Sequence, residues 1–182
     1  NCLFAGNAAK NGGGVYNDYI GPVLTHCTMA QNRADLVSAV ADGPGEDRPI
    51  RISDLVTATI LDHCIVWEHG GIVMSDSVVA TFSDIEHGWP GEGNMDVDPL
   101  FASPGYWGYD VDNRFVPGKD VWVDGDYHLM SQAGRWDTEA RVWVQDEVTS
   151  PCIDAGNPEG PIGDELFPNG GIANMGAFGG ST

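Results

Sequence analysis

The hydrophobic positions of the chain fall into short apolar runs, and polar segments rich in Gly, Asn and Asp separate these runs. The runs "VLTHCTM" (23–29) and "ILDHCIVW" (60–67) are typical, because they combine β-branched and other apolar residues and are bounded by Gly, Asn and Asp. Such runs predict short β-strands. Helical periodicity is nearly absent, and residues 33–42 are the only fair helix candidate. The pattern therefore predicts an all-β protein.

The opening residues "NCLF" (1–4) return as "HCTM" (26–29), "HCIV" (63–66) and "FSDI" (82–85). The small residue at the second place of each copy follows the previous one by 25, 37 and 19 positions. A polar, Gly- and Pro-rich insertion at about residues 39–51 accounts for the long step. Strands at this spacing are too far apart for a meander of hairpins, so they predict a solenoid of parallel coils.

Stacked coils bring equivalent residues together, about 4.8 Å apart. We expect an inward column of small residues, a second, apolar column, and a column of polar residues in the turns that bond to the next coil. These columns are Cys2, Cys27, Cys64 and Ser83; Phe4, Met29, Val66 and Ile85; and Asn1, His26 and His63.

Several phrases of the chain resemble a known family. The opening "NCLFAGNAAKNGGGVYN" (1–17) resembles the repeat of right-handed parallel β-helix proteins of the pectate-lyase-like superfamily. The rest resembles the C-terminal end of large secreted bacterial β-helix proteins. This second resemblance rests on the segments "SDIEHGWPGEGNMDVDPLF" (83–101), "DYHLMSQAGRWD" (126–137), "WVQDEVTSPCIDAGNP" (143–158) and "PNGGIANMGAFGG" (168–180). The resemblance implies a right-handed parallel β-helix and a secreted or cell-surface location, but no single activity.

The chain divides into two regions of one solenoid. We expect β-helix coils over residues 1–93, and loop-rich C-terminal coils with a cap over 94–182. We interpret the chain as a piece of a longer protein. Further strands are predicted near 96–101, 126–130, 148–154 and 172–178, with loops near 102–125, 131–147 and 156–171.

The charge balance narrows the choice of partners. Eight basic residues stand against 27 acidic ones, so the formal net charge is −19. Such a surface repels nucleic acid and anionic membranes and suits cations. No apolar run approaches the roughly 18 residues that a membrane-spanning helix needs, so membrane insertion is not expected.

Clustered carboxylates make Ca²⁺ the cofactor that the sequence suggests. Calcium takes six to eight oxygen ligands, and no cluster follows the order of an EF-hand loop. The best candidates lie in one acidic, loop-rich stretch of the C-terminal region, where the chain would have to fold back on itself. They are Asp110, Asp112, Asp120, Asp124 and Asp126.

Two tryptophans, Trp107 and Trp122, are candidates for stacking on sugar rings, which would make a glycan-binding face. The alternative is that they pack the long loops onto the flank of the solenoid, because large rings supply much apolar area to irregular segments. Both alternatives stay open at this point.

The cysteines and histidines have structural explanations. We expect four free, buried thiols, although a disulfide between Cys2 and Cys27 stays open because neighbouring coils bring Cα atoms within disulfide range. His69 and His87 each follow a Glu in a Gly-rich turn, where metal binding or acid–base chemistry is the alternative to a structural role.

These observations favour a non-catalytic structural or adhesive module of the cell surface or extracellular matrix. Its partners would be other copies of itself, stacked head-to-tail into a fibre, or matrix polysaccharide. The resemblance also admits a Ca²⁺-dependent polysaccharide lyase or a glycoside hydrolase, and the tryptophans admit a glycan-binding module. We assign no catalytic residue, because none of the basic residues lies in a motif that resembles a lyase site.

Overall fold

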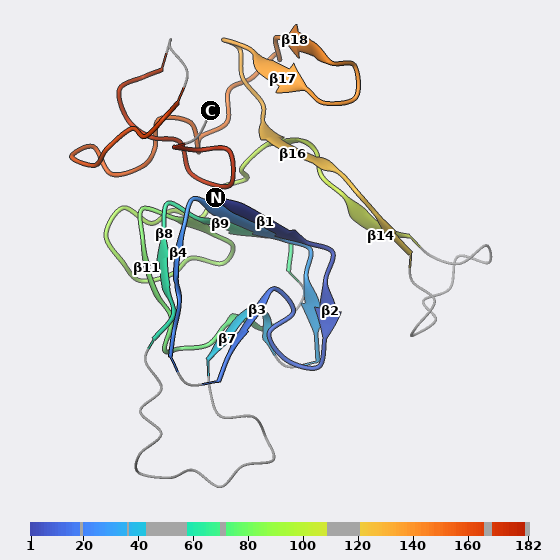
Figure 1. Ribbon diagram of the computed structural model, residues 1–182, viewed down its shortest axis with the longest axis vertical. Helices are drawn as coiled ribbons and strands as arrows, with labels where there is room; N and C mark the ends of the chain where they lie inside the picture. The colour runs from blue at the N-terminus through green and yellow to red at the C-terminus, as the bar shows by residue number, and fades with distance from the viewer. Residues whose placement is uncertain are drawn as a thin grey trace, which may run out of the picture.

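The computed structural model describes residues 1–18, 20–35, 37–42, 58–69, 72–108, 121–165 and 169–180, and its regular structure is all β (Figure 1). Over these ranges the sheets are small, and they are parallel in the first half and antiparallel in the second. The prediction of an all-β chain is confirmed. The described residues include no helix of the length and apolar character that crossing a membrane requires.

Parallel sheets organise the first half of the chain. The largest has the order β1-β5-β9-β12, formed by Cys2–Ala5, Cys27–Ala30, Ile65–Trp67 and Asp84–Ile85. The second has the order β10-β7-β3, formed by Ile72–Met74, Val37–Asp42 and Val15–Asn17. The third has the order β11-β8-β4, formed by Val79–Thr81, Ile60–Asp62 and Val23–Thr25. A short pair joins β2 (Ala8–Ala9) to β6 (Arg33–Ala34).

The strand register confirms the predicted apolar column. Phe4 is paired with Met29, Met29 with Val66, and Val66 with Ile85. The last three of these side chains are fully buried in one core cluster, and Phe4 packs against it from the edge. Burying an aliphatic side chain of this size contributes about 1.5–3 kcal/mol, so the column is a principal source of stability in this half.

The column of small residues is confirmed by the same register. Cys2 is paired with Cys27, and the pairing of Thr28 with Ile65 places Cys64 on the next strand beside Cys27. Ser83 completes the column, because its hydroxyl accepts a hydrogen bond of 3.0 Å from the backbone N–H of Cys64.

The turns before the largest sheet repeat one backbone conformation. His26, His63 and Phe82 have φ angles of 49°, 56° and 45°. Non-Gly residues rarely adopt this left-handed conformation, so a neighbouring contact must stabilise it. The rings stack, with centroids 4.7 Å apart for His26–His63 and 5.8 Å apart for His63–Phe82. His26 and His63 therefore stack as predicted, and Phe82 continues their column. The expected bonds to the next coil are wrong, because the side chains of Asn1, His26 and His63 contact backbone groups of the C-terminal segment.

The two outer edges of the parallel sheets differ in their contacts with the rest of the chain. The edge strands β1, β2, β3 and β4 all come from residues 2–25. At the opposite edge, the chain after β12 folds back over the strands: Met95 bridges to Asp84, the N–H of Phe82 donates to Glu92 O, and the Asn94 amide donates to Ala80 O. Residues 89–97 therefore cover this edge, whereas β1, β2, β3 and β4 are the outermost strands of their sheets at the other edge.

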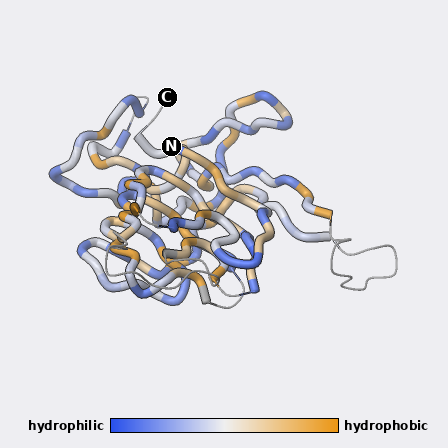
Figure 2. The backbone as a smooth tube through the Cα atoms, turned by 60° about the horizontal axis from the view of Figure 1, so that its bottom comes forward, coloured by the Kyte–Doolittle hydropathy of each residue, from blue (hydrophilic) through white to orange (hydrophobic). Residues whose placement is uncertain are grey.

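Three antiparallel pairs form the second half. Strand β13 (Phe101–Ser103) pairs with β16 (Asp126–Leu129), β14 (Tyr106–Gly108) with β15 (Val121–Val123), and β17 (Arg135–Asp137) with β18 (Val142–Val144). Figure 1 shows these strands leaving the parallel stack, while the chain beyond residue 150 returns to it. Figure 2 shows short hydrophobic and hydrophilic stretches interspersed along the whole chain.

Several sequence expectations for single segments are wrong. Residues 33–42 form β6 and β7 instead of a helix (Leu36 lies outside the described residues), because β7 pairs with strands on both sides and tertiary pairing overrides a weak local preference. The hairpins β14–β15 and β17–β18 lie where loops were expected. Residues 148–154 and 172–178 form turns instead of strands. Most of the expected insertion at 39–51 lies outside the described residues.

The apolar column makes a direct prediction about stability. Met29→Ala should lower the free energy of unfolding by about 2–5 kcal/mol, because it leaves a cavity at a fully buried site. Val79→Ala is the matched control, since Val79 lies on a parallel strand but is 51% exposed, and it should change stability by about 0.5 kcal/mol or less. Urea unfolding followed by circular dichroism measures both, and equal losses would contradict the inward column.

Candidate functional site

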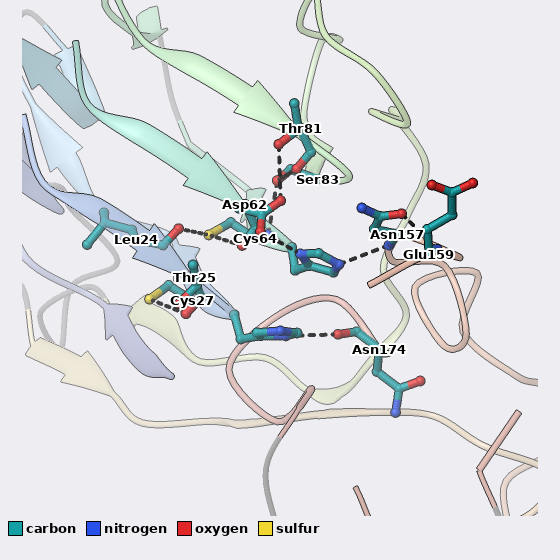
Figure 3. A network of polar contacts seen from close by, with 12 residues as sticks. Leu24, Thr25, Cys27, Asp62, Cys64, Thr81, Ser83, Asn157, Glu159 and Asn174 are labelled. Carbon is teal, nitrogen blue, oxygen red and sulfur yellow. Dashed lines mark hydrogen bonds and ion pairs between the residues drawn. The ribbon is translucent and has the colours of Figure 1, made fainter. Parts of the chain in front are cut away.

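A network of thiols, histidines and turns lies where the C-terminal segment meets the parallel sheets (Figure 3). Cys27 is 3% exposed and Cys64 is fully buried, whereas Cys2 is exposed on the edge strand β1. The thiol of Cys27 donates to Thr25 O at 3.4 Å, and that of Cys64 donates to Leu24 O at 3.3 Å. All four cysteines are free, as expected, but the expectation of burial is wrong for Cys2, which lies on β1 at the edge of its sheet.

The environment of Cys27 favours its thiolate. The neighbouring Cys64 side chain, and after it the backbone of Cys2, lower the pKa of Cys27, while burial opposes this shift. Burial raises the pKa of Cys64 well above its ordinary value, so Cys64 stays protonated. The chemically distinctive thiol of the column is therefore Cys27.

The histidine column holds the C-terminal turns. His63 Nε2 accepts a hydrogen bond of 2.9 Å from the N–H of Asn157, and His26 Nδ1 lies 3.2 Å from Asn174 O. His63 Nδ1 lies 3.0 Å from Asp62 Oδ2, although the angle falls short of a hydrogen bond. Burial, together with the neighbouring His63, lowers the pKa of His26. These contacts give both histidines structural roles.

His69 occupies the position in the third repeat that Asn7 and Asn32 occupy in the first two. Asn32 Oδ1 accepts hydrogen bonds from the N–H and the amide of Asn7, at 3.0 and 2.9 Å. His69 follows Cys64 by the same five positions that separate Asn32 from Cys27, and its ring nitrogens lie 3.1 Å from Asn32 O and Met29 O. Burial lowers its pKa. The buried ring of His69 and the exposed His87 do not form the paired site that sequence reasoning had considered.

A buried carboxyl links the two halves of the chain. Asp84 has no exposed surface, and its Oδ2 accepts a hydrogen bond of 3.1 Å from the thiol of Cys152. Its Oδ1 accepts a bond of 3.1 Å from the N–H of Val97. Burial raises the pKa of Asp84 to about 6. Burial, with the charge of Asp84, also raises the pKa of Cys152, so the thiol remains the donor.

The predicted calcium ligands are only partly described. Asp110, Asp112 and Asp120 lie outside the described residues. Asp124 accepts a hydrogen bond of 2.6 Å from the indole N–H of Trp122, and Asp126 is shared between His128 and Arg135. Within the described residues, no three His, Cys, Asp or Glu side chains are placed to hold a metal ion. Calcium binding by the five aspartates stays a prediction.

Sequence reasoning missed an ionic cluster behind the β17–β18 hairpin. Arg135 binds both carboxylate oxygens of Asp146, at 3.0 and 3.3 Å, and also reaches Asp126 at 3.3 Å. The Nδ1 of His128 lies 2.6 Å from Asp126 Oδ1, and the ring of His128 stacks on Phe178 at 3.8 Å. Nothing in the spacing of these residues marked them, because the cluster joins segments that meet only in the fold.

Trp107 and Trp122 lie against the flank of the parallel stack. They contact each other edge-to-face at 5.4 Å, and the guanidinium of Arg33 lies 4.8 Å from the Trp107 ring. The indole N–H of Trp107 donates to Gln31 O at 2.9 Å, and a Cβ at Gly6 would collide with the Trp122 ring. Both rings are half-buried. These contacts correspond to the loop-packing alternative, and glycan binding by this pair stays a prediction.

The more exposed indoles lie on the β17–β18 hairpin. Trp136 and Trp143 face each other across the two strands and are 44% and 61% exposed. The ring of Trp143 packs over Gly134, where a Cβ would collide with it. The alternation in "RWD" and "VWV" is a strand signal that could have located this pair.

One comparison with known proteins gives a match. Residues 108–156 match the family model described as "Disaggregatase related". This segment contains Trp122, the ionic cluster around Arg135, the exposed indole pair and Cys152. The chain matches no curated protein and no solved structure at a significant level.

The buried Asp84 predicts a specific pH dependence. Because its folded pKa of about 6 exceeds the ordinary value of 3.8, its contribution to stability is present below pH 4 and is lost as the pH rises through 6. The loss amounts to about 3 kcal/mol. Asp84→Asn should remove this loss, so the variant should gain stability relative to wild type between pH 4 and 7.

Urea unfolding at several pH values measures this difference, and Asp76→Asn makes the same change at an exposed position as a control. The control should leave the wild-type profile in place. An Asp84→Asn curve parallel to that of wild type would mean that folding does not raise the pKa of Asp84.

Proposed function

We propose that the chain is a non-catalytic structural or adhesive module of the cell surface or extracellular matrix, built as a right-handed parallel β-helix. We further propose that it associates with a second copy of itself through its first-coil edge. The first-coil edge is the set of strands β1, β2, β3 and β4 within residues 2–25.

The register of the parallel sheets supports the β-helix. The three larger sheets take their strands from successive repeats, and the small and apolar columns run in register through the largest of them. Parallel strands joined by crossover connections are right-handed in about 98% of cases, which supports the proposed hand.

The single observation that carries the association is that every parallel sheet has an edge strand in the same stretch of chain. An edge strand presents unpaired N–H and C=O groups that can pair with another chain. This edge also exposes large apolar side chains: Leu3 is 44% exposed, Val23 64% and Ile20 79%.

Charge favours a second copy as the occupant. Residues 1–25 contain one basic residue, Lys10, and one acidic residue, Asp18, whereas the whole chain carries a net charge of −19. Two copies would therefore repel each other least where their first-coil edges meet. Because the same surface would serve both copies, the pairing would be isologous and would close as a dimer.

Head-to-tail growth into a fibre would need a further step. It would bring the first-coil edge of one copy to the far edge of another, where residues 89–97 already occupy the backbone groups of Phe82 and Ile85. A closed pair needs no such displacement, so we propose it as the first assembly and regard the fibre as dependent on release of that segment.

The ionic cluster gives less support to the enzyme alternative. The Asp126–His128 pair has a spacing that suits acid–base chemistry. Arg135, however, takes the second oxygen of Asp126, and Phe178 covers one face of the His128 ring. These contacts suit a brace between β16, β17 and the C-terminal turn.

A glycan-binding role is a second candidate, and the exposed pair Trp136 and Trp143 is the observation that favours it. Aromatic faces open to solvent can stack on sugar rings. The strongly negative chain would favour a neutral polysaccharide over an acidic one.

The association is tested by sedimentation velocity and electron microscopy over a concentration series, with Ca²⁺ and with chelator. Wild type should form a discrete dimer as its concentration rises. Leu3→Glu should weaken this association by at least about tenfold, because it buries two like charges at the interface. Val79→Glu is the matched control, since Val79 is similarly exposed but lies on β11, and it should associate as wild type does.

Monomers at every concentration would overturn the association. Filaments would show that the far edge is also used and would restore the head-to-tail arrangement. Equal effects of the two glutamate variants would show that net charge, rather than the first-coil edge, controls assembly.

The glycan alternative is tested by affinity electrophoresis in soluble neutral polysaccharides such as dextran and xyloglucan. Retardation should weaken by about two- to tenfold in Trp136→Ala and in Trp143→Ala, because each ring loses its stacking contact. Trp107→Ala is the control, since its indole is half-buried and bonded to Gln31. If retardation weakens only in Trp107→Ala, the glycan site is the pair Trp107 and Trp122 predicted from the sequence. If wild type is not retarded, the glycan-binding proposal is wrong.

A further inference from the structure

Three thiols lie in one column that begins at the first-coil edge with Cys2, and they differ in access to solvent. Cys2 is exposed, Cys27 is 3% exposed and Cys64 is fully buried. Cys2 and Cys27 are direct partners in the β1–β5 register. Directly paired Cα atoms in neighbouring strands lie about 4.8 Å apart, which is within the range of about 4.4–6.8 Å found in disulfides.

We propose that Cys2 and Cys27 form a redox clamp, in which a low-molecular-weight disulfide oxidises the two thiols to a disulfide that ties the edge strand β1 to β5. Cys2 is the thiol that the oxidant reaches, Cys27 is the resolving thiol, and Cys64 stays reduced. The clamp is a property of the single chain and does not depend on the proposed association.

The sheet order selects this pair over Cys27 and Cys64. Strands β5 and β9 are interior strands held on both sides, whereas β1 has a neighbour on one side only. The edge strand can therefore adjust to the closer Cβ separation that a disulfide requires. An external oxidant also reaches the buried Cys27 and Cys64 far less readily than Cys2.

The reaction has two exchange steps. The Cys2 thiolate attacks one sulfur of the small disulfide, forms a mixed disulfide and releases one small thiolate. The Cys27 thiolate then attacks Cys2 Sγ, the mixed disulfide breaks, and a second small thiolate leaves. Two protein thiols are oxidised, one small disulfide is reduced to two thiols, and the protons of the two cysteines pass to the leaving thiolates.

The surroundings of Cys27 suit the resolving role. The neighbouring Cys64 side chain lowers its pKa, so more of Cys27 is thiolate at neutral pH than of an ordinary thiol. A thiolate, not a thiol, is the attacking species in disulfide exchange. Cys64 thus assists the second step through its proximity to Cys27 and is not itself oxidised.

The experiment treats the full chain with oxidised glutathione, at a concentration where sedimentation shows monomers. The protein is then alkylated in denaturant and mapped as peptides by mass spectrometry without reduction. Wild type should contain a Cys2–Cys27 cross-link, with Cys64 and Cys152 alkylated. A Cys27–Cys64 link, a persistent glutathione adduct on Cys2 or the absence of any reaction would each overturn the clamp.

Single variants separate the two steps. Cys27→Ser should accumulate glutathione on Cys2, because the resolving thiol is gone. Cys2→Ser should gain no adduct, because the remaining thiols of the column are buried. Adduct formation on Cys27 in Cys2→Ser would contradict the assigned order of steps. Circular dichroism of each variant verifies that the fold is retained.

The pH profile tests the role of Cys64. The rate of the second step in wild type should reach half its maximum at a pH below 9.0, the ordinary pKa of a thiol. In Cys64→Ala this midpoint should move up by about one pH unit or more, because the thiolate loses the neighbour that lowers its pKa. An unchanged midpoint would remove Cys64 from the proposal, whereas slower closure at every pH would indicate only a structural role.

Discussion

In-register stacking of equivalent side chains is the constraint on which the rest of this structure depends. Phe4, Met29, Val66 and Ile85 pair across successive parallel strands and form one face of a buried core. Once that column is set, the period-2 alternation of a strand fixes the neighbouring positions. The thiols therefore come to lie two residues before the apolar column, and the stacked turn residues lie one residue before the thiols.

The C-terminal half is held to this stack by polar contacts as well as by packing. The Cys152 thiol binds the buried carboxyl of Asp84, the N–H of Asn157 binds His63, and the N–H of Ala177 binds the hydroxyl of Thr28. Burying a carboxyl costs free energy unless hydrogen bonds satisfy it, and here the oxygens of Asp84 accept two. Such contacts specify one docking position, since any shift would leave buried groups unpaired.

The first-coil edge combines three properties that favour contact with another chain. It presents the edge strands of the parallel sheets, it exposes apolar side chains, and residues 1–25 balance one positive against one negative charge in a strongly acidic chain. The exposed Cys2 lies on the same edge and is the register partner of Cys27. The proposed association and the proposed redox clamp therefore both involve β1.

The sequence by itself determined the all-β class and the residues of the stacked columns, because a repeated pattern records which positions share one environment. It also indicated free thiols, although not the exposure of Cys2. Only the tertiary structure decided that residues 33–42 are strands and not a helix, that hairpins replace the expected loops, and that Arg135 joins Asp126 to Asp146. These features depend on contacts between segments with no shared repeat, so no local pattern of hydrophobic and polar residues encodes them.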